Sequence, residues 1–323
     1  MARILTGIQS TGAPHLGNLL GAIRPAIDLA HQDDNESFLF IADMHSLTQI
    51  KGGSDLRDNT YAVAAAWLAF GLDTQRSVFY RQSDVAEVTE LAWYLNCFFP
   101  YQRLTLAHSF KDKSDRLEDV NSGLFSYPML MAADILLYDA DYVPVGKDQL
   151  QHLEMTRDVA SRFNHKMGET FVVPKEMVRQ ETQLIPGVDG EKMSKSKGNT
   201  INIFDAPNAL KKHINKNIIT DATPLEDPKE PNGSVVWQLY QLVASAADAD
   251  AMAEKLRAGG YGWGHAKKDL LDALVDGFAQ ERDDFNRWMS DKAMLDAELA
   301  KGAERAREIA QPVLQRVRTK IGF

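Results

Sequence analysis

Residues 3–9 read Arg-Ile-Leu-Thr-Gly-Ile-Gln, and residues 10–18 continue Ser-Thr-Gly-Ala-Pro-His-Leu-Gly-Asn. The first run is short and apolar, as expected of a buried strand, and the Gly- and Pro-containing segment after it predicts a turn. Apolar side chains then recur at helical spacing over residues 16–29. A strand, a turn and a helix in this order predict the first unit of an open α/β sheet.

The same alternation continues along the first half of the chain. Short strands are predicted at 37–42, 77–80 and 142–145, and helices at 56–70, 85–99 and 149–163. This rhythm predicts a doubly wound parallel sheet. A charged stretch and then a helix from about residue 128 form a predicted insertion, and 174–190 is expected to be loop. From about residue 203 only helical patterns follow, at 205–216, 234–246, 266–288 and 294–317.

The predicted fold is therefore α/β, with two domains. Residues 1–202 are expected to form a Rossmann-like domain with an inserted segment near 101–138. Residues 203–323 are expected to form an all-helical domain.

Composition narrows the class of protein. Of the 323 residues, 44% are hydrophobic and 25% are charged, which is typical of a soluble globular protein. No apolar run approaches the roughly 18 residues of a membrane span, and residues 1–10 lack a signal-peptide core, so no membrane association is expected. The single cysteine, Cys97, excludes an internal disulfide and a cysteine metal cluster. We expect a cytoplasmic protein.

The charge distribution bears on nucleic-acid binding. A net charge of -9 argues against a general nucleic-acid binder and restricts any RNA contact to a local patch. The stretch 304–320 carries five basic residues against two acidic ones. From the pattern alone, a solvated helical face is the favoured interpretation of that stretch.

The turn after the first strand is the first candidate site. At the carboxyl end of a parallel strand, the N–H groups of the following helix face an anion. Gly17 would let a nucleotide approach the backbone, and His15 could donate to a phosphate oxygen. Taken alone, the segment fits an ordinary turn with a surface histidine better.

Residues 192–196, Lys-Met-Ser-Lys-Ser, are the second candidate site. Two lysines three positions apart in a polar loop suit a triphosphate whose charge must be neutralised. On spacing alone, a solvated basic loop would be the better interpretation.

Together, Pro-His-Leu-Gly-Asn at 14–18 and Lys-Met-Ser-Lys-Ser at 192–196 resemble the paired signatures of class I aminoacyl-tRNA synthetases. The second is an unaltered match. The first departs from the family's His-Ile-Gly-His at Asn18, and Asn is usual there in the tryptophan branch. The resemblance to this branch runs through most of the chain, and its most telling segments lie at 7–12, 43–48, 127–138 and 143–152.

The resemblance implies an enzyme that activates L-tryptophan with ATP, releases pyrophosphate and transfers tryptophan to the 3'-terminal ribose of tRNA(Trp). It implies Mg²⁺ carried by ATP, a homodimer bridged by one tRNA, and anticodon binding by residues 203–323. Trp237, Tyr240, Lys267 and Lys268 are possible RNA contacts, although core aromatics and surface lysines are favoured for each singly. A tyrosyl enzyme, a smaller nucleotidyltransferase and a paralogue without catalysis remain alternatives.

The resemblance also implies roles for single residues. Asp134, in the apolar helix Met-Ala-Ala-Asp-Ile-Leu-Leu, would accept the indole N–H, because a buried carboxylate suits a ligand with one donor. Met131 would pack on the ring, and Gln149 with His45 would hold the α-amino or carboxylate end. His152 is either a satisfied helix residue or part of that shell.

The ATP side is implied in the same way. The catalytic groups would be His15, Lys192, Lys195 and Lys113, with Lys111 competing for the place of Lys113. The ATP-binding residues would be Gln9, Ser10, Thr11, Gly17, Asn18, Gly146, Lys147, Asp148, Leu184, Ile185, Lys192, Met193, Ser194, Lys195 and Ser196.

Overall fold

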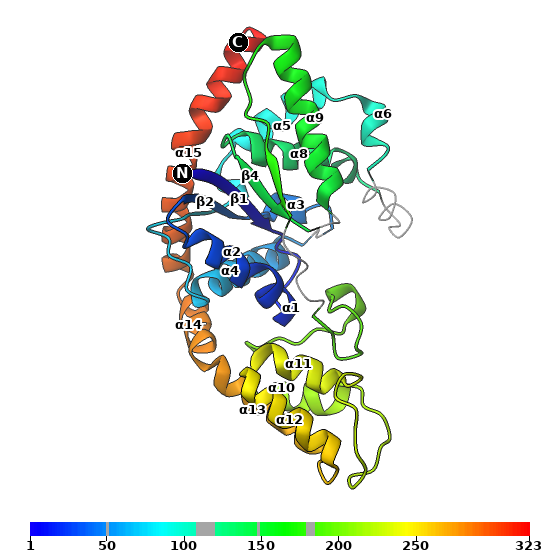
Figure 1. Ribbon diagram of the computed structural model, residues 1–323. Helices are drawn as coiled ribbons and strands as arrows, with labels where there is room; N and C mark the ends of the chain where they lie inside the picture. Colours follow the sequence, from blue (N-terminus) through cyan, green and yellow to red (C-terminus); the bar gives the residue numbers. More distant parts are fainter. Residues whose placement is uncertain (50–51, 108–119, 147–148, 179–184) are drawn as a thin grey trace.

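The computed structural model describes residues 1–49, 52–107, 120–146, 149–178 and 185–323. Five parallel strands form one sheet in the order β3-β2-β1-β4-β5 (Figure 1). Their bounds are Ala2–Ile8 for β1, Asn35–Ile41 for β2, Val78–Arg81 for β3, Tyr142–Val145 for β4 and Lys175–Val178 for β5. The predicted doubly wound parallel sheet is confirmed, and the strand order reverses beside β1.

The register brings the carboxyl ends of the strands to one edge. β1 and β2 pair over their whole length, from Ala2 with Asn35 to Ile8 with Ile41. Residues 38–41 of β2 are all buried, an unbroken apolar run that suits a strand covered on both faces. Because ligands of open α/β sheets bind outside the carboxyl ends where the order reverses, the edge after β1 and β4 is the expected site.

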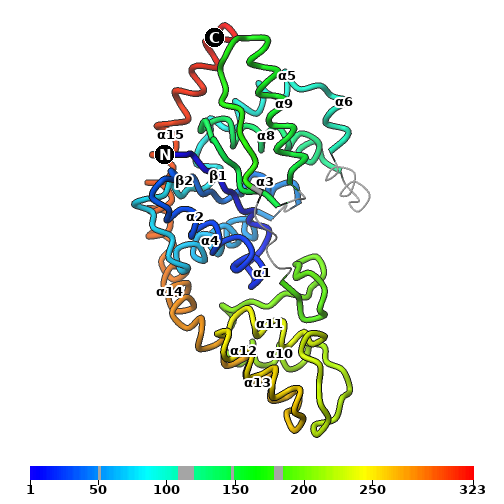
Figure 2. Tube along the Cα trace, in the orientation of Figure 1, coloured from blue at the N-terminus to red at the C-terminus, as the bar shows by residue number. Residues whose placement is uncertain are grey.

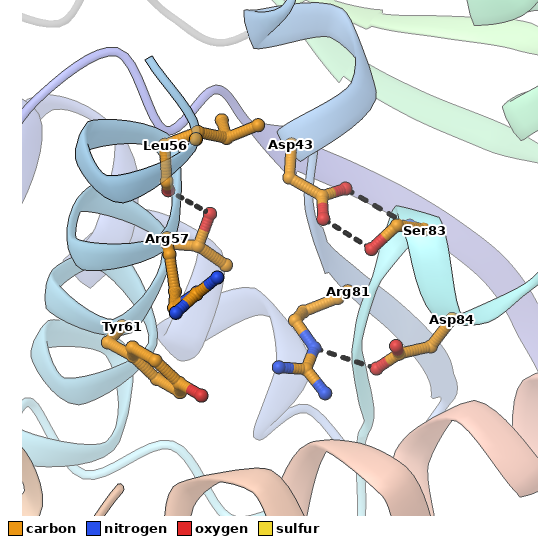
Figure 3. A pocket seen from close by; sticks show the side chains of 9 residues that line it. Asp43, Leu56, Arg57, Tyr61, Arg81, Ser83 and Asp84 are labelled. Carbon is orange, nitrogen blue, oxygen red and sulfur yellow. Dashed lines mark hydrogen bonds and ion pairs between the residues drawn. The ribbon is translucent and has the colours of Figure 1, made fainter.

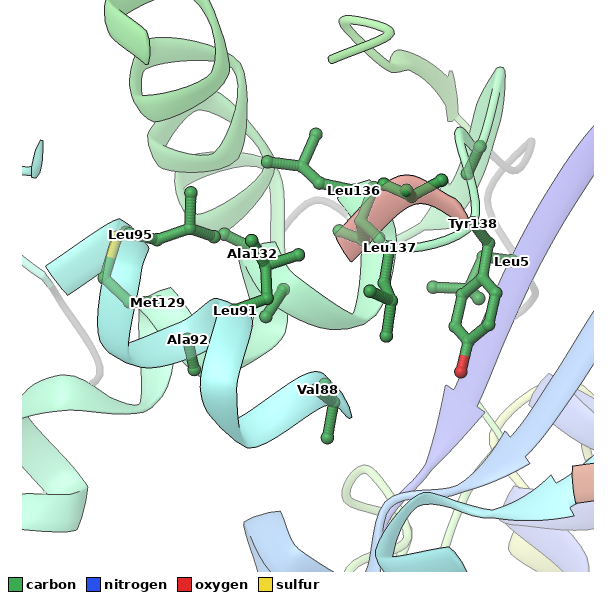
Figure 4. Close-up of a cluster of buried hydrophobic side chains, with 14 of the residues drawn as sticks. Leu5, Val88, Leu91, Ala92, Leu95, Met129, Ala132, Leu136, Leu137 and Tyr138 are labelled. Carbon is green, nitrogen blue, oxygen red and sulfur yellow. The ribbon is translucent and has the colours of Figure 1, made fainter. Parts of the chain in front are cut away.

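Two hydrophobic clusters cover the two faces of the sheet. One joins Phe38 and Phe40 to α5 (Glu87–Phe98), α8 (Ser122–Leu136) and α9 (Leu150–Met167). Figure 4 shows part of it, with Leu91 and Leu95 of α5 facing Met129 of α8. The other cluster joins Leu39 and Ile41 to the helices after β1 and to α4 (Gly53–Ala69). Alternate residues of β2 therefore face opposite layers.

The helix expected at 16–29 has three parts. α1 (Leu16–Asn18) passes into a π-helical turn at Leu19–Ile23 and then into α2 (Arg24–Ala30). Pro25 stands at the start of α2 and has no N–H to donate, so the regular i−4 ladder cannot run through it. The wide turn before Pro25 accommodates that break.

Two elements in the middle of the chain differ from expectation. α8 begins at Ser122, about six residues early, because Asn121 caps it by accepting from Leu124 N–H at 3.1 Å. Pro128 then lies inside the helix. β5 falls within the stretch expected to be loop, and it pairs with β4 from Tyr142 with Lys175 to Val145 with Val178.

The part of the chain after residue 203 contains helices and no strand, as predicted. Its elements are α10 (Pro207–Asn217), α11 (Val235–Val243), α12 (Ala246–Ala258), α13 (Trp263–Gly277), α14 (Ala279–Ser290) and α15 (Lys292–Ile321). Helix α12 was not among the predicted helices, and its first turn is capped by Ser245. Among the described residues, no helix has both the length and the apolar character needed to cross a membrane.

The last helix does not stay with the others. Figures 1 and 2 show α15 running back along the sheet, away from α10 to α13. Ala303, Ala306 and Val313 belong to the cluster that contains α5 and α8. Gly302 lies so close to β3 that a Cβ there would stand 1.7 Å from Phe79 O. Residues 292–321 therefore pack on the sheet domain, although the expected domain boundary at residue 203 would assign them to the helical domain.

This packing also accounts for the basic stretch at 304–320. Arg305 donates to Thr74 O at 2.7 Å and to Ser77 O at 2.9 Å, next to the start of β3. Arg316 pairs with Asp139 at 2.6 Å, and Arg318 donates two bonds of 2.6 Å to Glu90. These arginines bind α15 to the sheet domain. The helix covers β3, an edge strand whose outer side would otherwise be open.

Candidate active site

The turn after β1 is anchored by a buried hydroxyl network. Ser10 N–H donates to Ser46 Oγ at 2.9 Å, and Thr60 Oγ1 donates to Ser10 Oγ at 3.1 Å. Ser10 lies just after β1, Ser46 ends α3 (Asp43–Ser46), and Thr60 lies near the middle of α4. The chain then turns through Gly12, whose φ of +148° is rare for residues with a side chain.

His15 and Asn18 form a capping box at the N-terminus of α1. His15 Nδ1 accepts from Asn18 N–H at 3.3 Å, and Asn18 Oδ1 accepts from His15 N–H at 3.2 Å. Burial, followed by the nearby charge of Lys195, lowers the pKa of His15 to about 4. The imidazole is therefore neutral at pH 7, and because Nδ1 accepts, the proton is on Nε2, which can donate to a ligand.

The two sequence motifs meet in space. Gly17 N–H faces Met193 Sδ at 3.3 Å, and Lys195 Nζ donates to Gly12 O at 2.7 Å. A Cβ on Gly12 would lie 3.2 Å from Lys195 Nζ, and one on Gly17 would lie 3.0 Å from the His15 ring. Burial lowers the pKa of Lys195 to about 8. The close approach of the loop to the turn thus depends on glycine at both positions.

The rest of the 192–196 motif lies on a compact loop. Met193 N–H donates to Ile185 O at 2.9 Å, and Pro186 bridges Lys192 in antiparallel fashion. Ser194 Oγ and Ser196 Oγ lie 2.9 Å apart. Lys192 is exposed, and its side chain makes no ion pair or hydrogen bond among the described residues.

Asp134 lies in a second, fully buried group of polar side chains. His45 Nε2 lies 2.9 Å from Asp134 Oδ2, and Gln82 Nε2 donates to both carboxylate oxygens at 2.8 and 2.9 Å. Asp134 is 3% exposed. Burial raises the pKa of Asp134, while the bonds from His45 and then Gln82 oppose that rise. Half-buried Met131 precedes Asp134 by one turn of α8.

Gln149 joins this group through two further residues. Gln149 Oε1 lies 3.1 Å from His152 Nδ1, and His152 Nε2 is hydrogen-bonded to the Tyr127 hydroxyl. The Tyr127 ring packs edge-on against His45, with centroids 6.2 Å apart. The structure therefore brings Asp134, His45 and Gln149 into one region.

A bond between α3 and the turn after β3 fixes His45 and Gln82 relative to each other. Asp43 accepts from Ser83 N–H at 3.0 Å and from the Ser83 hydroxyl, beside a polar cavity of about 320 Å³ (Figure 3). His45 lies two residues after Asp43, and Gln82 precedes Ser83 directly. Burial raises the pKa of Asp43, and the bonds from Ser83 counteract it.

Three residues of this region were not assigned by the sequence analysis. Gln82 directly follows β3, and that position was its only sequence signal. Tyr127 lies seven residues before Asp134 and so on the same face of α8. His152 had two open interpretations, and both of its ring nitrogens are hydrogen-bonded, one to Gln149 and the other to Tyr127.

Other predicted site residues are spread over the same edge. Gln9, Thr11 and Gly146 follow β1 and β4, and Ile185 contacts the 192–196 loop. Lys111, Lys113, Lys147, Asp148 and Leu184 lie outside the described residues. Within the described residues, no group of three or more His, Cys, Asp or Glu side chains is arranged to hold a metal ion.

Comparison with known proteins agrees with this geometry. A protein from Rhodopirellula baltica named tryptophan–tRNA ligase is 47% identical over 321 residues, which are 99% of each chain. One of the same name from Neisseria meningitidis is 42% identical over 330 residues, 99% of this chain and 98% of its own. The crystal structure of tryptophanyl-tRNA synthetase from Campylobacter jejuni complexed with ADP and tryptophan superposes with a TM-score of 0.95 at 42% identity, covering 99% of this chain and 100% of that one.

The family comparison gives the same result over most of the chain. The model of the family described as tRNA synthetases class I (W and Y) matches residues 1–279, which include the motifs at 14–18 and 192–196 and the Asp134 cluster. This chain therefore belongs to the class I tRNA synthetases of the tryptophan and tyrosine family.

Proposed function

We propose that this chain is an aminoacyl-tRNA synthetase that activates L-tryptophan with ATP and loads it onto tRNA(Trp). The observation that carries the choice of amino acid is the buried carboxylate of Asp134, together with relatives named tryptophan–tRNA ligase at 42–47% identity. Indole offers one N–H donor and no acceptor, which a buried carboxylate satisfies. A phenylalanine ring has no N–H donor, so it would add no hydrogen bond to those that Asp134 accepts from His45 and Gln82.

In the proposed first step, a tryptophan carboxylate oxygen attacks the α-phosphorus of ATP. The new P–O bond forms as the bond between the α-phosphorus and the bridging oxygen breaks, and pyrophosphate leaves with the electron pair. The attacking carboxylate is already ionised at neutral pH, so no general base is required. Catalysis then rests on positioning and on stabilising the developing phosphate charge.

The described residues supply both functions. Neutral His15 presents Nε2–H beside the N-terminus of α1, where the helix dipole favours a phosphate. Lys195 would exchange Gly12 O for a phosphate oxygen, and exposed Lys192 would join it as the 192–196 loop closes. We assign Gln149 to the polar end of tryptophan and His45 to the Asp134 end, since His45 contacts that carboxylate.

The remaining assignments complete this proposal. Mg²⁺ would arrive on the ATP phosphates and neutralise part of their charge. Gln9, Ser10, Thr11, Gly146 and Ile185 would line the nucleotide, together with Lys147, Asp148 and Leu184. Lys113, or alternatively Lys111, would meet the pyrophosphate.

For the second step, we propose that the 3'-terminal ribose hydroxyl of tRNA attacks the carbonyl carbon of the adenylate. The ester bond forms as the bond between that carbon and the phosphate oxygen breaks, AMP leaves with the electron pair, and the hydroxyl proton is released. We also propose that residues 203–290 bind the anticodon region of a tRNA that bridges a cytoplasmic homodimer. Several of the candidate RNA contacts have internal partners. Trp237 Nε1 donates to Ala249 O at 3.1 Å, and Lys267 donates to Ile218 O at 2.7 Å. In this proposal, the RNA contacts are therefore made by other residues of the segment 203–290.

The deciding experiment is ATP–pyrophosphate exchange with tryptophan, with tyrosine and without an amino acid. We expect exchange with tryptophan alone, followed by charging of tRNA(Trp). If tyrosine drove the exchange, the substrate would be tyrosine and not the proposed tryptophan. Absence of exchange with either would indicate a paralogue that has lost catalysis.

A further inference from the structure

Asn199 lies just beyond the 192–196 motif, and none of the assignments above includes it. It is 2% exposed. Its Oδ1 accepts from Ser194 N–H at 2.7 Å, while its Nδ2 donates to Asp189 Oδ1 at 2.7 Å and to Lys192 O at 3.2 Å. Both N–H donors and the carbonyl acceptor of the Asn199 side chain are therefore hydrogen-bonded. Two of the three bonds go to the backbone on either side of Met193, at Lys192 and Ser194.

The backbone around Asn199 is built to receive it. Val188 N–H donates to Asn199 O at 3.0 Å. A Cβ on Gly187 would lie 2.4 Å from Asn199 Cγ and 2.7 Å from Asn199 O, so a larger residue at 187 would displace the asparagine. Gly198 adopts φ +67° and reverses the chain directly before Asn199.

These contacts decide where the two lysines of the motif project. Because Asn199 holds Lys192 O and Ser194 N–H, the backbone on either side of Met193 is fixed. Met193 is buried, with its sulfur against Gly17 N–H at 3.3 Å. Lys195 follows one residue after the bonded Ser194 N–H and reaches Gly12 O at 2.7 Å. The side chain of Asn199 is thus the link between the 187–190 turn and the direction of both ammonium groups.

We propose that Asn199, with Asp189 as its partner, is a positioning residue that aims Lys192 and Lys195 at the ATP phosphates. This inference rests on the proposed function of the same loop. Asn199 touches no reacting atom itself. Its effect is exerted through the loop backbone, and it belongs to the ATP half of the reaction only.

The first test is Asn199→Ala in the full chain, assayed by tryptophan-dependent ATP–pyrophosphate exchange. Because misplacing a charged group by about 1 Å can cost roughly a hundredfold in rate, we expect kcat to fall by about that factor and KM for ATP to rise. KM for tryptophan should not change, because the Asp134 cluster is untouched. That split separates positioning from general destabilisation, which would alter both substrates together.

Asn202→Ala is the matched control. Asn202 also caps a turn, with Oδ1 accepting from Phe204 N–H at 3.0 Å and Nδ2 donating to Asp205 at 2.9 Å, but it does not contact the 192–196 loop. We expect exchange at the wild-type rate. An equal loss in both variants would reveal an unspecific effect of removing a turn asparagine and would overturn the proposal.

A partner swap tests the contact directly. Asn199→Asp removes both donors and sets a second carboxylate against Asp189, so exchange should fall at least as far as in Asn199→Ala. Combining it with Asp189→Asn restores one donor and one acceptor across the same pair. We expect the double variant to recover at least tenfold of the lost rate, an effect equivalent to about 1.4 kcal/mol of coupling. A double variant no faster than Asn199→Asp would contradict the proposal.

Tryptic cleavage within 192–197 gives a readout that does not depend on activity. Asn199→Ala should be cut at Lys192 and Lys195 faster than wild type, while Asn202→Ala should match it. Wild-type protein without exchange would refute the proposed function, yet this cleavage difference would still be measurable. Wild-type exchange together with unchanged kcat, KM for ATP and cleavage in Asn199→Ala would refute the positioning role alone.

Discussion

The Asp134 cluster and the 192–196 loop occupy the same edge of the sheet and differ in how completely their polar groups are bonded. Asp134 is 3% exposed and accepts from two residues that are themselves buried. Lys195 lies at the surface, with its ammonium partly covered where it donates to one backbone carbonyl, Gly12 O, at 2.7 Å. In the proposed function, the amino-acid side is therefore formed before the substrate arrives, whereas the ATP side exchanges a protein partner for a phosphate.

The difference has an energetic basis. Buried polar groups are expensive to leave unbonded, so the Asp134 cluster must be satisfied in the free protein. The Lys195 ammonium, which is only partly covered, loses little when it releases one carbonyl, because water or a phosphate oxygen can replace that bond. Substitutions on the two sides should therefore affect different kinetic parameters.

The largest effect is expected for Lys195→Ala. Removing a charge that stabilises phosphate in the transition state should lower kcat for ATP–pyrophosphate exchange by about 10²- to 10³-fold. Tryptophan binding, followed by equilibrium titration, should stay at the wild-type value. Lys197→Ala is the control, since Lys197 pairs with Glu191 on the same loop and should be dispensable. Unaltered exchange in Lys195→Ala would remove this loop from the ATP side.

Next in size is Asp134→Asn, which keeps the shape but removes the charge. A hydrogen bond to a charged group contributes about 1.5–3 kcal/mol, so kcat/KM for tryptophan should fall roughly tenfold to hundredfold. KM for ATP should be unaffected. If both substrates weakened equally, the two sides would not be separable in the way described.

Gln82→Leu should have a smaller effect on the same side. It removes both Gln82 bonds to Asp134, and KM for tryptophan should rise about tenfold. The bond from Gln82 lowers the pKa of Asp134, so its loss should raise that pKa. Tryptophan binding in the variant should then weaken on acidification from a higher pH than in wild type. A parallel pH profile in both proteins would argue against this role of Gln82.

The smallest effect concerns the pH dependence of the ATP side. The pKa of Lys195 is lowered to about 8, so in the free protein its ammonium is charged below that pH and loses its proton above it. The kcat/KM for ATP should therefore decline on the alkaline side, by about twofold at pH 8. Lys195→Arg should abolish this decline, because arginine keeps its charge. A decline retained in Lys195→Arg would assign it to another group.

The sequence predicted the sheet and the position of the two motifs because both signals are local. A short apolar run with a turn and a helix after it identifies β1 whatever lies elsewhere in the chain. The family resemblance implied that both motifs bind ATP, but the contact between Lys195 and Gly12 was not predicted, since 183 residues separate the two. Asn18 is explained by local geometry as well, through the capping box with His15.

What could not be predicted depends on partners distant in sequence. The local sequence does not distinguish Gln82 from other polar residues, because its partner Asp134 lies 52 residues later, on α8. β5 has four residues, too few for a clear sequence pattern, and it forms a strand because it pairs with β4. The arginines of α15 looked like a solvated face because their acceptors, such as Ser77 O and Glu90, lie far earlier in the chain.

Helix α15 is the last helix of the chain, so the ribosome synthesises it long after the strand β3 that it covers. The contact between Arg305 and Thr74 spans 231 residues, so β3 leaves the ribosome long before its cover does. At about 5–20 residues per second, this interval lasts roughly 10–50 s. During that time β3 presents unpaired N–H and C=O groups at an open edge, which can pair with another chain. A nascent chain halted after α14 would be the form most prone to aggregate.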